Sequence, residues 1–316
     1  MRILVTGAAG FGGSGLVKAL IDHGHEVVGV DIVAPKHANL LFNVLAKIEY
    51  RWKSCQDLGS DDLYGVQIVV HMAAQADVPM GFQSPRWTIE NNITATLRLL
   101  EAARHCSLNK LILASSGSVF GRALRIPITE DHALTPHNPY AASKACQELL
   151  CQAYHRSYKV PVVIMRNGIV YGPNMRREIF IWKWLEALLS GGRLVIEGGA
   201  QTRDPCYVSD TIDAWMRCIE APQEKVVGEV FQVSFGREWS VLDIARLCAK
   251  TVGIQGDDKF EISSYRAGEE GQRECFNIEK AKNVLGYSPT VSLEDGLLKL
   301  VTWMRQNGFP SSREAS

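Results

Sequence analysis

Short apolar runs alternate with amphipathic windows in the first half of the chain. The runs are rich in valine and isoleucine and show little polar alternation, which is typical of strands buried on both faces of a parallel sheet. They lie at Arg2–Thr6, Glu26–Asp31, Ile48–Trp52, Gln67–His71, Lys110–Ser115 and Val160–Arg166. Windows with apolar residues at helical spacing lie at Gly12–His23, Pro85–His105 and Asn138–Tyr158. This order predicts an α/β fold, a doubly wound parallel sheet covered by helices.

The pattern changes after about residue 166. Helical windows at Arg177–Ser190 and Val241–Val252 alternate there with glycine-rich turns such as Gly198-Gly199. We expect residues 1–166 to form the sheet domain. Residues 167–306 should form mainly a smaller, mixed α/β substrate lobe, with some segments that return to the first domain, and residues 307–316 a flexible tail.

Composition narrows the class of protein. The 316 residues are 46% apolar, and Lys plus Arg equal Asp plus Glu at 34 each. This balance predicts no nucleic-acid partner and no membrane attachment, and no apolar run is long enough to span a bilayer. The N-terminal segment lacks the layout of a signal peptide, so we expect a cytoplasmic protein. Eight cysteines without a C-x-x-C pair are expected to be reduced, and eight dispersed histidines predict no metal site.

A glycine-rich turn follows the first predicted strand. Gly7, Gly10 and Gly13 have the spacing G-x-x-G-x-x-G, and Phe11 and Gly12 lie between them. Such a turn lets the backbone approach a pyrophosphate closely and places the N-terminus of the next helix beside it. Because the turn lies between a predicted strand and a predicted helix, it indicates a dinucleotide-binding Rossmann domain.

The second predicted strand ends in a carboxylate, Asp31, 18 residues after Gly13. An acid in this place can accept hydrogen bonds from the ribose hydroxyls of an adenosine and would repel a 2′-phosphate. The next residues, Ile32 and Val33, offer no cation for that phosphate. We therefore predict NAD as the cofactor rather than NADP. The alternative is a solvent-exposed aspartate at the end of a strand.

A tyrosine, a lysine and a serine make a candidate catalytic group. Tyr140 and Lys144 are one helical turn apart and share a face of the predicted helix. A lysine ammonium and a positive nicotinamide ring would both favour the phenolate, so Tyr140 could act as a base near neutral pH. Ser116 could hydrogen-bond the same substrate hydroxyl. The pattern Y-x-x-x-K alone is common on helix surfaces, and only its combination with the glycine turn and the serines favours catalysis.

Taken in chain order, these motifs resemble the extended short-chain dehydrogenase/reductase family, which contains NAD-dependent epimerases and dehydratases of nucleotide sugars. The resemblance runs nearly from end to end. It includes the glycine turn, Asp57-Leu58, His71-Met-Ala-Ala74, Asn92, Ser115-Ser116, Tyr140, Lys144, Tyr171-Gly-Pro173, Arg203-Asp-Pro-Cys-Tyr-Val-Ser-Asp210, Arg266-Ala-Gly-Glu269 and Asn277-Ile-Glu-Lys-Ala281.

The resemblance implies roles for further residues. Contacts to the cofactor would come from Asp57, Leu58, Ala73, Ala74, Ser115, Tyr140 and Lys144, besides the glycine turn and Asp31. Contacts to a nucleotide sugar, expected to be UDP-linked, would come from Ser116, Ser118, Ile169, Arg203 and Arg266. The two arginines would bind its phosphates. For Arg203 the alternative is an ion pair with an acidic loop. One of Trp182 and Trp184 could approach the nucleoside, although helical tryptophans are more often in the core.

The two residues after Ser116 bear on the reaction. Family members that remove water from the sugar carry an Asp-Glu pair there, whereas this chain has Gly117 and Ser118. The missing carboxylates disfavour dehydration, and the segment Ser115-Ser-Gly-Ser118 instead resembles that of the family's 4-epimerases. The resemblance implies a 4-epimerase, which oxidises C4 transiently to a 4-keto sugar and reduces it again on the other face. The remaining alternatives within the family are a dehydratase, a 4-keto reductase, and a decarboxylase that would use Arg176 or Arg177 for a C6 carboxylate. A non-catalytic NAD-binding regulatory protein is the alternative from a different class.

Several residues depart from the family pattern, mostly on the substrate side. The family's usual isoleucine and histidine in the glycine turn are Gly12 and Gly15, a tyrosine is Phe120, an asparagine is Ile169 and a serine is Gly81. The identity of the sugar therefore stays open.

Dimers of the family commonly pair two helices from each subunit. The matching windows here are Pro85–His105 and Asn138–Tyr158. The second window carries a stripe of small and apolar residues, Ala142, Cys146, Leu149, Leu150 and Ala153, which could allow close approach of a second helix. The resemblance therefore implies a homodimer. The alternative is that this face packs against the sheet within one molecule.

Overall fold

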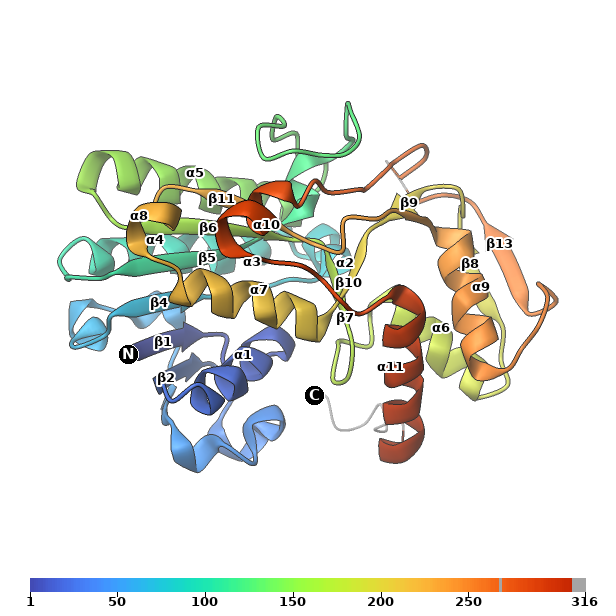
Figure 1. Cartoon of the computed structure of the whole chain (residues 1–316), viewed down its shortest axis with the longest axis horizontal. Helices are drawn as coiled ribbons and strands as arrows, with labels where there is room; N and C mark the ends of the chain where they lie inside the picture. Colours follow the sequence, from blue (N-terminus) through green and yellow to red (C-terminus); the bar gives the residue numbers. More distant parts are fainter. Residues whose placement is uncertain (267–268, 309–316) are drawn as a thin grey trace.

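The computed structural model in Figure 1 describes residues 1–266 and 269–308, and within them the predicted parallel sheet is present. It has seven strands, all parallel, in the order β11-β6-β5-β4-β1-β2-β3 among the described residues. The strands are β1 (Arg2–Thr6), β2 (Glu26–Asp31), β3 (Glu49–Trp52), β4 (Ile68–His71), β5 (Lys110–Ser116), β6 (Val162–Asn167) and β11 (Val230–Val233). The predicted α/β fold with a doubly wound parallel sheet is confirmed.

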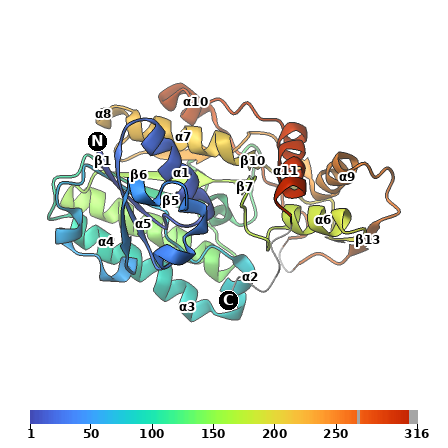
Figure 2. The ribbon, with the colours of Figure 1, turned by 90° about the horizontal axis from the view of Figure 1, so that it is seen from below.

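Helices cover both faces of this sheet (Figure 2). On one face lie α1 (Phe11–Asp22), α7 (Val208–Glu220), α8 (Gln223–Val226) and α10 (Glu279–Leu285). On the other lie α2 (Val78–Gln83), α3 (Pro85–Ile89), α4 (Ala95–Ala103) and α5 (Pro139–Tyr158). None of the helices in the described part of the chain is long and apolar enough to cross a membrane.

Helix α5 begins and ends where its local sequence predicts. The side chain of Asn138 accepts a hydrogen bond from the Ala141 N–H at 2.8 Å, and Pro139 occupies the first helical position. Lys159 ends the helix in the left-handed conformation, with φ at 60°. The dipeptide Val160-Pro161 follows, and a residue before proline disfavours the helical conformation.

The predicted helix Pro85–His105 is interrupted. The structure has α3, then a π-helical turn at Glu90–Thr94, and then α4. Inside the turn the Asn92 side chain accepts a hydrogen bond from the Gln75 N–H at 2.7 Å and donates one to the Gln75 carbonyl at 3.0 Å. These contacts with a distant segment accompany a change of helical period that local hydrophobic spacing does not reveal.

A smaller lobe is built from the second half of the chain, at the right in Figure 1. Its helices are α6 (Phe180–Leu189), α9 (Val241–Val252) and α11 (Leu293–Asn307). Its short strands form pairs: β7 (Ile169–Tyr171) with β10 (Pro205–Tyr207), β8 (Leu194–Glu197) with β13 (Phe260–Ser263), and β9 (Thr202–Arg203) with β12 (Trp239–Ser240). The lobe has its own core, which includes Trp182, Trp184, Leu185, Ile244 and Leu297. The helix predicted to begin at Arg177 begins three residues later, at Phe180.

Segments of the second half return to the sheet. Strand β11 pairs with β6 at its edge, and α7 packs against α1. Gly15 of α1 faces Ile212 of α7, and a Cβ on Gly15 would lie 3.3 Å from Ile212 Cδ1. A glycine here therefore permits close packing of the two helices, which offsets the cost of glycine within a helix.

Candidate active site

A cleft of about 1410 Å³ lies between the sheet and the smaller lobe. Residues at the carboxyl ends of neighbouring strands line one wall, and Phe180, Lys183 and Trp184 of α6 belong to the lining on the lobe side. Ligands of open parallel sheets bind at this end of the strands. The volume exceeds that of a typical site for one small molecule, so the cleft has room for a dinucleotide and a second ligand.

The structure brings most of the predicted site residues to this cleft. From the predicted cofactor group, Gly7, Gly10, Phe11, Gly12, Gly13, Asp31, Ala73, Ala74 and Tyr140 line it. All predicted substrate residues line it as well, namely Ser116, Ser118, Ile169, Arg203 and Arg266. Four predicted cofactor residues do not belong to the lining: Asp57, Leu58, Ser115 and Lys144. From the Asp57 segment, Ser54 and Cys55 reach the cleft instead.

The glycine turn has no room for side chains at two of its positions. Gly7 has φ at +69°, and its N–H donates to the Val30 carbonyl at 2.9 Å. A Cβ on Gly13 would lie 2.0 Å from the Gly7 carbonyl oxygen. The turn thus stays tight, and the first residues of α1, Phe11–Gly13, line the cleft. The N-terminus of a helix is a favourable place for a diphosphate.

The carboxylate of Asp31 is held at the edge of this turn. One oxygen accepts a hydrogen bond from the Ala9 N–H at 2.9 Å and the other accepts one from the Val33 N–H at 3.0 Å. Ile32 and Val33 line the cleft beside it and bring no positive charge. This arrangement fits the two ribose hydroxyls of NAD, and a 2′-phosphate would meet a fixed negative charge.

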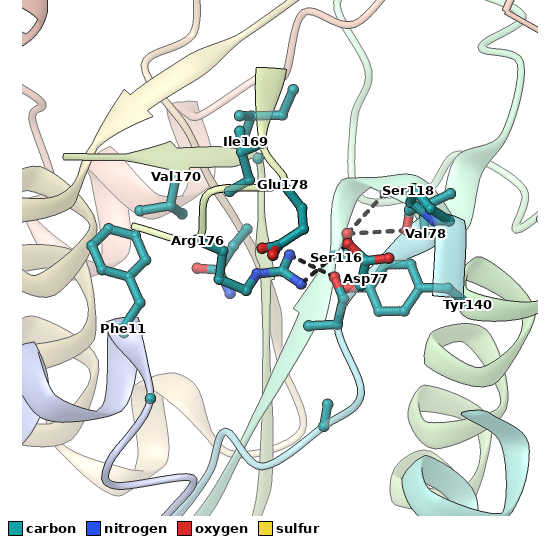
Figure 3. Close-up of a pocket in the computed structure, with 18 of the residues that line it drawn as sticks. Phe11, Asp77, Val78, Ser116, Ser118, Tyr140, Ile169, Val170, Arg176 and Glu178 are labelled. Atoms are coloured by element: carbon teal, nitrogen blue, oxygen red, sulfur yellow. Dashed lines mark hydrogen bonds and ion pairs between the residues drawn. The ribbon is translucent and has the colours of Figure 1, made fainter. Parts of the chain in front are cut away.

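Ser116 and Tyr140 meet at the wall of the cleft (Figure 3). Ser116 ends β5, and its hydroxyl oxygen accepts hydrogen bonds from the Ser118 N–H at 3.2 Å and from the Ser118 hydroxyl at 3.0 Å. Tyr140 lies in the first turn of α5. Burial raises the pKa of Tyr140, while a hydrogen bond with Ser116 and the positive charge of Arg176 act in the opposite direction.

Lys144 lies one turn further along α5, beneath this pair. Its ammonium donates to the Ala114 carbonyl at 2.8 Å. Burial lowers the pKa of Lys144 to about 8, so the ammonium form still predominates at neutral pH.

Ser115 is turned away from the cleft. Its hydroxyl donates to a carboxylate oxygen of Glu148 at 2.5 Å, and Glu148 forms a buried ion pair with Arg166. No motif in the sequence points to Glu148 or Arg166 as a site residue. The signal in the sequence is that Glu148 follows Lys144 at helical spacing, on a face that the catalytic helix turns inward.

A buried polar layer supports the catalytic residues from below. Asn92 donates to the Ser143 hydroxyl at 2.9 Å, and that hydroxyl donates to the Tyr140 carbonyl at 2.7 Å. His71 lies between the hydroxyls of Thr6, at 2.8 Å, and Thr96, at 3.0 Å. Burial lowers the pKa of His71 to about 3, so this histidine is neutral near pH 7.

The two arginines of the predicted diphosphate site are already paired with carboxylates. Arg203 lies 3.0 Å from Glu269 and 3.9 Å from Glu274, which is the ion pair with an acidic loop that the sequence left as the alternative. Arg266 pairs with Glu197. Since both arginines also line the cleft, the pairing leaves them at the surface that a phosphate would meet. Ala267 and Gly268, between Arg266 and Glu269, lie outside the described residues.

Both tryptophans of α6 belong to the core of the smaller lobe. Trp184 donates its indole N–H to the Val195 carbonyl at 3.0 Å and also lines the cleft. Trp182 does not line it. The interpretation of helical tryptophans as core residues is therefore confirmed, with Trp184 at the boundary between core and cleft.

Arg176 and Glu178 extend into the cleft from the loop after β7, toward Ser116 and Tyr140 (Figure 3). Arg176 donates to the Ala76 carbonyl at 2.7 Å and lies 3.7 Å from a carboxylate oxygen of Asp77. From the sequence, Arg176 is a candidate only in the decarboxylase alternative, and Glu178 is not among the predicted site residues. Their signal is the charged tripeptide Arg176-Arg177-Glu178 directly before an apolar helix.

Gly117 is closed in by Phe276. A Cβ on Gly117 would lie 2.2 Å from the Cζ atom of the buried Phe276 ring. An aspartate, as in the dehydratase pattern, could not occupy this place unless the ring moved.

Comparison with known proteins identifies the class. The model of the NAD dependent epimerase/dehydratase family matches residues 3–234, and the chain belongs to this family. The predicted family and the predicted cofactor, NAD, are confirmed.

Individual relatives cover nearly the whole chain. A UDP-glucose 4-epimerase of Mycolicibacterium smegmatis is 34% identical over 96% of this chain and 99% of its own length. The crystal structure of a UDP-glucuronic acid 4-epimerase from Bacillus cereus, in complex with UDP-glucuronic acid and NAD, is 32% identical. It has a TM-score of 0.90 and covers 97% of this chain and 100% of its own. A dTDP-glucose 4,6-dehydratase, DesIV of Streptomyces venezuelae, has a TM-score of 0.89 at 30% identity, with 97% and 98% coverage.

Proposed function

We propose that this chain is an NAD-dependent nucleotide-sugar 4-epimerase. The observation that carries the proposal is the meeting of Ser116 and Tyr140 in a cleft that also contains the glycine turn and Asp31. The named 4-epimerases among its relatives support the same activity. The chain would use its cofactor catalytically, because the oxidation at C4 and the later reduction cancel.

Tyr140, Ser116 and Lys144 would have separate roles in moving the proton of the sugar O4 hydroxyl. Tyr140 would accept the proton of the sugar O4 hydroxyl, and Ser116 would orient that hydroxyl through a hydrogen bond. Bound NAD supplies the acceptor, and later the donor, of the C4 hydride. A positive charge favours the phenolate against the effect of burial, and Arg176 acts in this way on Tyr140. The Lys144 ammonium, one turn further along α5, would act in the same direction. On the return step Tyr140 would give the proton back to O4 of the turned 4-keto sugar.

The surroundings of Gly117 favour epimerisation over dehydration. Loss of water from C5 and C6 needs an acid and a base besides the tyrosine. The two positions after Ser116 are Gly117 and Ser118, and the Phe276 ring fills the space above the first of them. The dehydratase relatives support dehydration only as the alternative within the same fold.

Arg176 favours a uronic acid as the sugar. Its side chain lines the cleft and extends toward Ser116 and Tyr140 (Figure 3). Guanidinium and carboxylate groups pair in a bidentate geometry, so Arg176 could hold a C6 carboxylate beside the reacting carbon. We therefore propose UDP-glucuronate as the first candidate substrate and UDP-glucose as the second, which agrees with the two kinds of relatives.

We also propose a cytoplasmic homodimer. The free thiols of all eight cysteines support a reducing compartment. Two apolar side chains stand exposed on the helices of the proposed interface, Leu97 on α4 at 38% and Leu149 on α5 at 57%. Burial of such residues between two copies would favour association.

Proton NMR of the sugar tests the proposed activity. The purified protein is incubated in turn with UDP-glucuronate, UDP-glucose and UDP-N-acetylglucosamine, without an external reductant. We expect a new H4 signal with the small coupling of an equatorial proton, from UDP-glucuronate first. An accumulating 4-keto product or released CO2 would instead identify a dehydratase or a decarboxylase. No conversion of any of the three would contradict the proposal for these sugars.

A further inference from the structure

A buried ion pair lies directly beneath the catalytic residues. The side chains of Glu148 and Arg166 are 0% and 3% exposed, and their charged atoms approach to 2.7 Å. One carboxylate oxygen of Glu148 accepts hydrogen bonds from the Ser115 hydroxyl at 2.5 Å and from Arg166 Nε at 2.9 Å. The other accepts from Arg166 Nη2 at 2.7 Å. Both oxygens are therefore fully engaged.

Arg166 is fixed on its remaining sides. Its Nη1 donates to the Glu130 carbonyl at 2.9 Å, and the guanidinium lies 4.8 Å from the centre of the Phe120 ring. A buried ion pair brings little net stability, because the cost of removing both charges from water offsets their attraction. Stability alone does not account for a pair that apolar side chains of similar volume could replace.

The place of Glu148 relates it to the active site. Tyr140, Lys144 and Glu148 occupy successive turns on one face of α5. Ser115, the hydroxyl partner of Glu148, precedes Ser116 on β5. Glu148 thus joins the helix that carries Tyr140 and Lys144 to the strand that presents Ser116.

We propose that Glu148, countered by Arg166, is a positioning residue for the catalytic group: it fixes the end of β5 through Ser115 and sets a negative charge behind the Lys144 ammonium. This inference rests on the proposed function, since it assigns Glu148 a part in the same reaction.

The charge of Glu148 acts on Lys144 together with the other groups around that ammonium. Burial lowers the pKa of Lys144 to about 8, and Glu148 and Cys151, further along α5, act against that fall. His71 of β4 is neutral. Tyr140 lies one turn away on the same helix, and Arg166 of β6 lies behind Glu148. Without the charge of Glu148, the ammonium would lose its proton at a lower pH.

The double substitution Glu148→Gln with Arg166→Met tests the charge. It removes both charges, and the amide oxygen still accepts from Ser115. The 13Cε NMR signal of Lys144, assigned by its loss in the Lys144→Met variant, should titrate at a lower pH than in the wild-type protein. The alkaline limb of kcat should move the same way, so that kcat at pH 9 falls by about tenfold for a displacement of one pH unit.

Two further variants separate charge from geometry. Ser115→Ala removes the hydrogen bond and keeps the charge, and it should lower kcat without moving the alkaline limb. Arg166→Lys keeps the countercharge and should leave the alkaline limb where it lies in the wild-type protein. If the double variant does not fold, Glu148→Asp draws the charge back from Lys144 and should move both readouts in the same direction, by less.

An unchanged Lys144 midpoint together with an unchanged alkaline limb would overturn the proposal, even if the melting temperature fell, because a merely structural role predicts that result. If the wild-type protein converts no sugar, the proposed function fails instead. The NMR titration of Lys144 needs no substrate and would then still decide the role of the Glu148 charge.

Discussion

Tyr140 and Lys144 need opposite protonation states, and burial works against both. The tyrosine must lose a proton to act as a base, yet burial raises its pKa. The lysine must keep its proton to favour the phenolate, yet burial lowers its pKa to about 8. Activity should therefore fall on the alkaline side, as the pH rises through the pKa of Lys144 and the ammonium is lost. A base of this kind depends on the charges arranged around it.

Removal of the phenol should abolish most of the catalysis. We expect Tyr140→Phe to lower kcat by about 10²- to 10⁴-fold, the usual contribution of a positioned acid or base. Binding of the cofactor should remain, and it can be measured with NADH through the fluorescence of the reduced nicotinamide. Tyr158→Phe, at the exposed end of the same helix, is the matched control and should keep full activity. A Tyr140→Phe protein with near wild-type kcat would show that another group is the base.

Loss of the Arg176 cation should affect a sugar acid selectively. Arg176→Met should weaken kcat/KM for UDP-glucuronate by about 10- to 100-fold, the effect of losing about 1.5–3 kcal/mol from a charged hydrogen bond. The value for UDP-glucose should change little. Steady-state kinetics measures kcat/KM for both sugars. For Arg176→Lys, which keeps the charge, kcat/KM for UDP-glucuronate should lie between the values of the wild-type protein and of Arg176→Met. Equal losses for both sugars would remove the argument for a uronic acid.

The sequence reveals residues whose spacing carries the chemistry, and it misses those whose role arises from tertiary contact. The glycine turn, Asp31, Ser116, Tyr140 and Lys144 follow from local motifs. The partner of Ser115 could not be predicted, because Glu148 and Arg166 meet only when α5 packs against β6.

At the scale of elements, the turn after β5 and the loop before α10 pack closely against each other, and the missing side chain of Gly117 makes room for the ring of Phe276. Gly117 follows β5, and the Phe276 ring occupies the space that a side chain on Gly117 would need. Phe276 belongs to a small core with Val119, Phe120 and Ile128. The match closes the position from which a dehydratase would present its acid.

A double-mutant cycle should reveal this match. Gly117→Ala should cost about 1–3 kcal/mol of unfolding free energy through overpacking. Phe276→Ala should cost about 3–5 kcal/mol through the cavity that it leaves. In the double variant the new methyl group enters that cavity, so the combined cost should be smaller than the sum. Urea denaturation measures all three variants, and strictly additive costs would mean that the two residues do not share the space.

Periodicity predicted most helices and strands of the first half to within about two residues, but not every element. The strand β11 was missed, because four residues, Val230–Val233, give too short a pattern and include the polar Gln232. The π-helical turn at Glu90–Thr94 was missed because its Asn92 contacts depend on a distant backbone segment.

At the scale of the whole molecule, the cleft exists because some segments of the second half of the chain belong to the sheet domain and others form the smaller lobe. The segments α7, β11 and α10 complete the sheet domain, while α6, α9 and α11 build the lobe across the cleft. The fold and the cofactor could be predicted because they depend on local motifs in the first half. The sugar could not, since its contacts come from loops such as that of Arg176 and Glu178, which only the fold brings to Tyr140.

The proposed dimer can be tested with two leucines of equal exposure. Leu149 on α5 and Leu298 on α11 are both 57% exposed. We expect Leu149→Asp to give a monomer, because it would bury a charge in the proposed interface, whereas Leu298→Asp should leave the assembly unchanged. Sedimentation velocity measures the mass of each variant. A monomeric wild-type protein, or two variants with the same mass, would contradict an interface through α5.

The fate of the hydrogen on C4 tests the central claim most directly. UDP-glucuronate or UDP-glucose that carries deuterium at C4 is converted in ordinary water, and the product is examined by NMR and mass spectrometry. If the protein oxidises C4 and returns the same hydride to the other face, the epimer keeps its deuterium at C4. With UDP-glucose, a 4-keto product that carries deuterium at C6 would identify a dehydratase. With either sugar, an epimer without deuterium would contradict the proposed reaction.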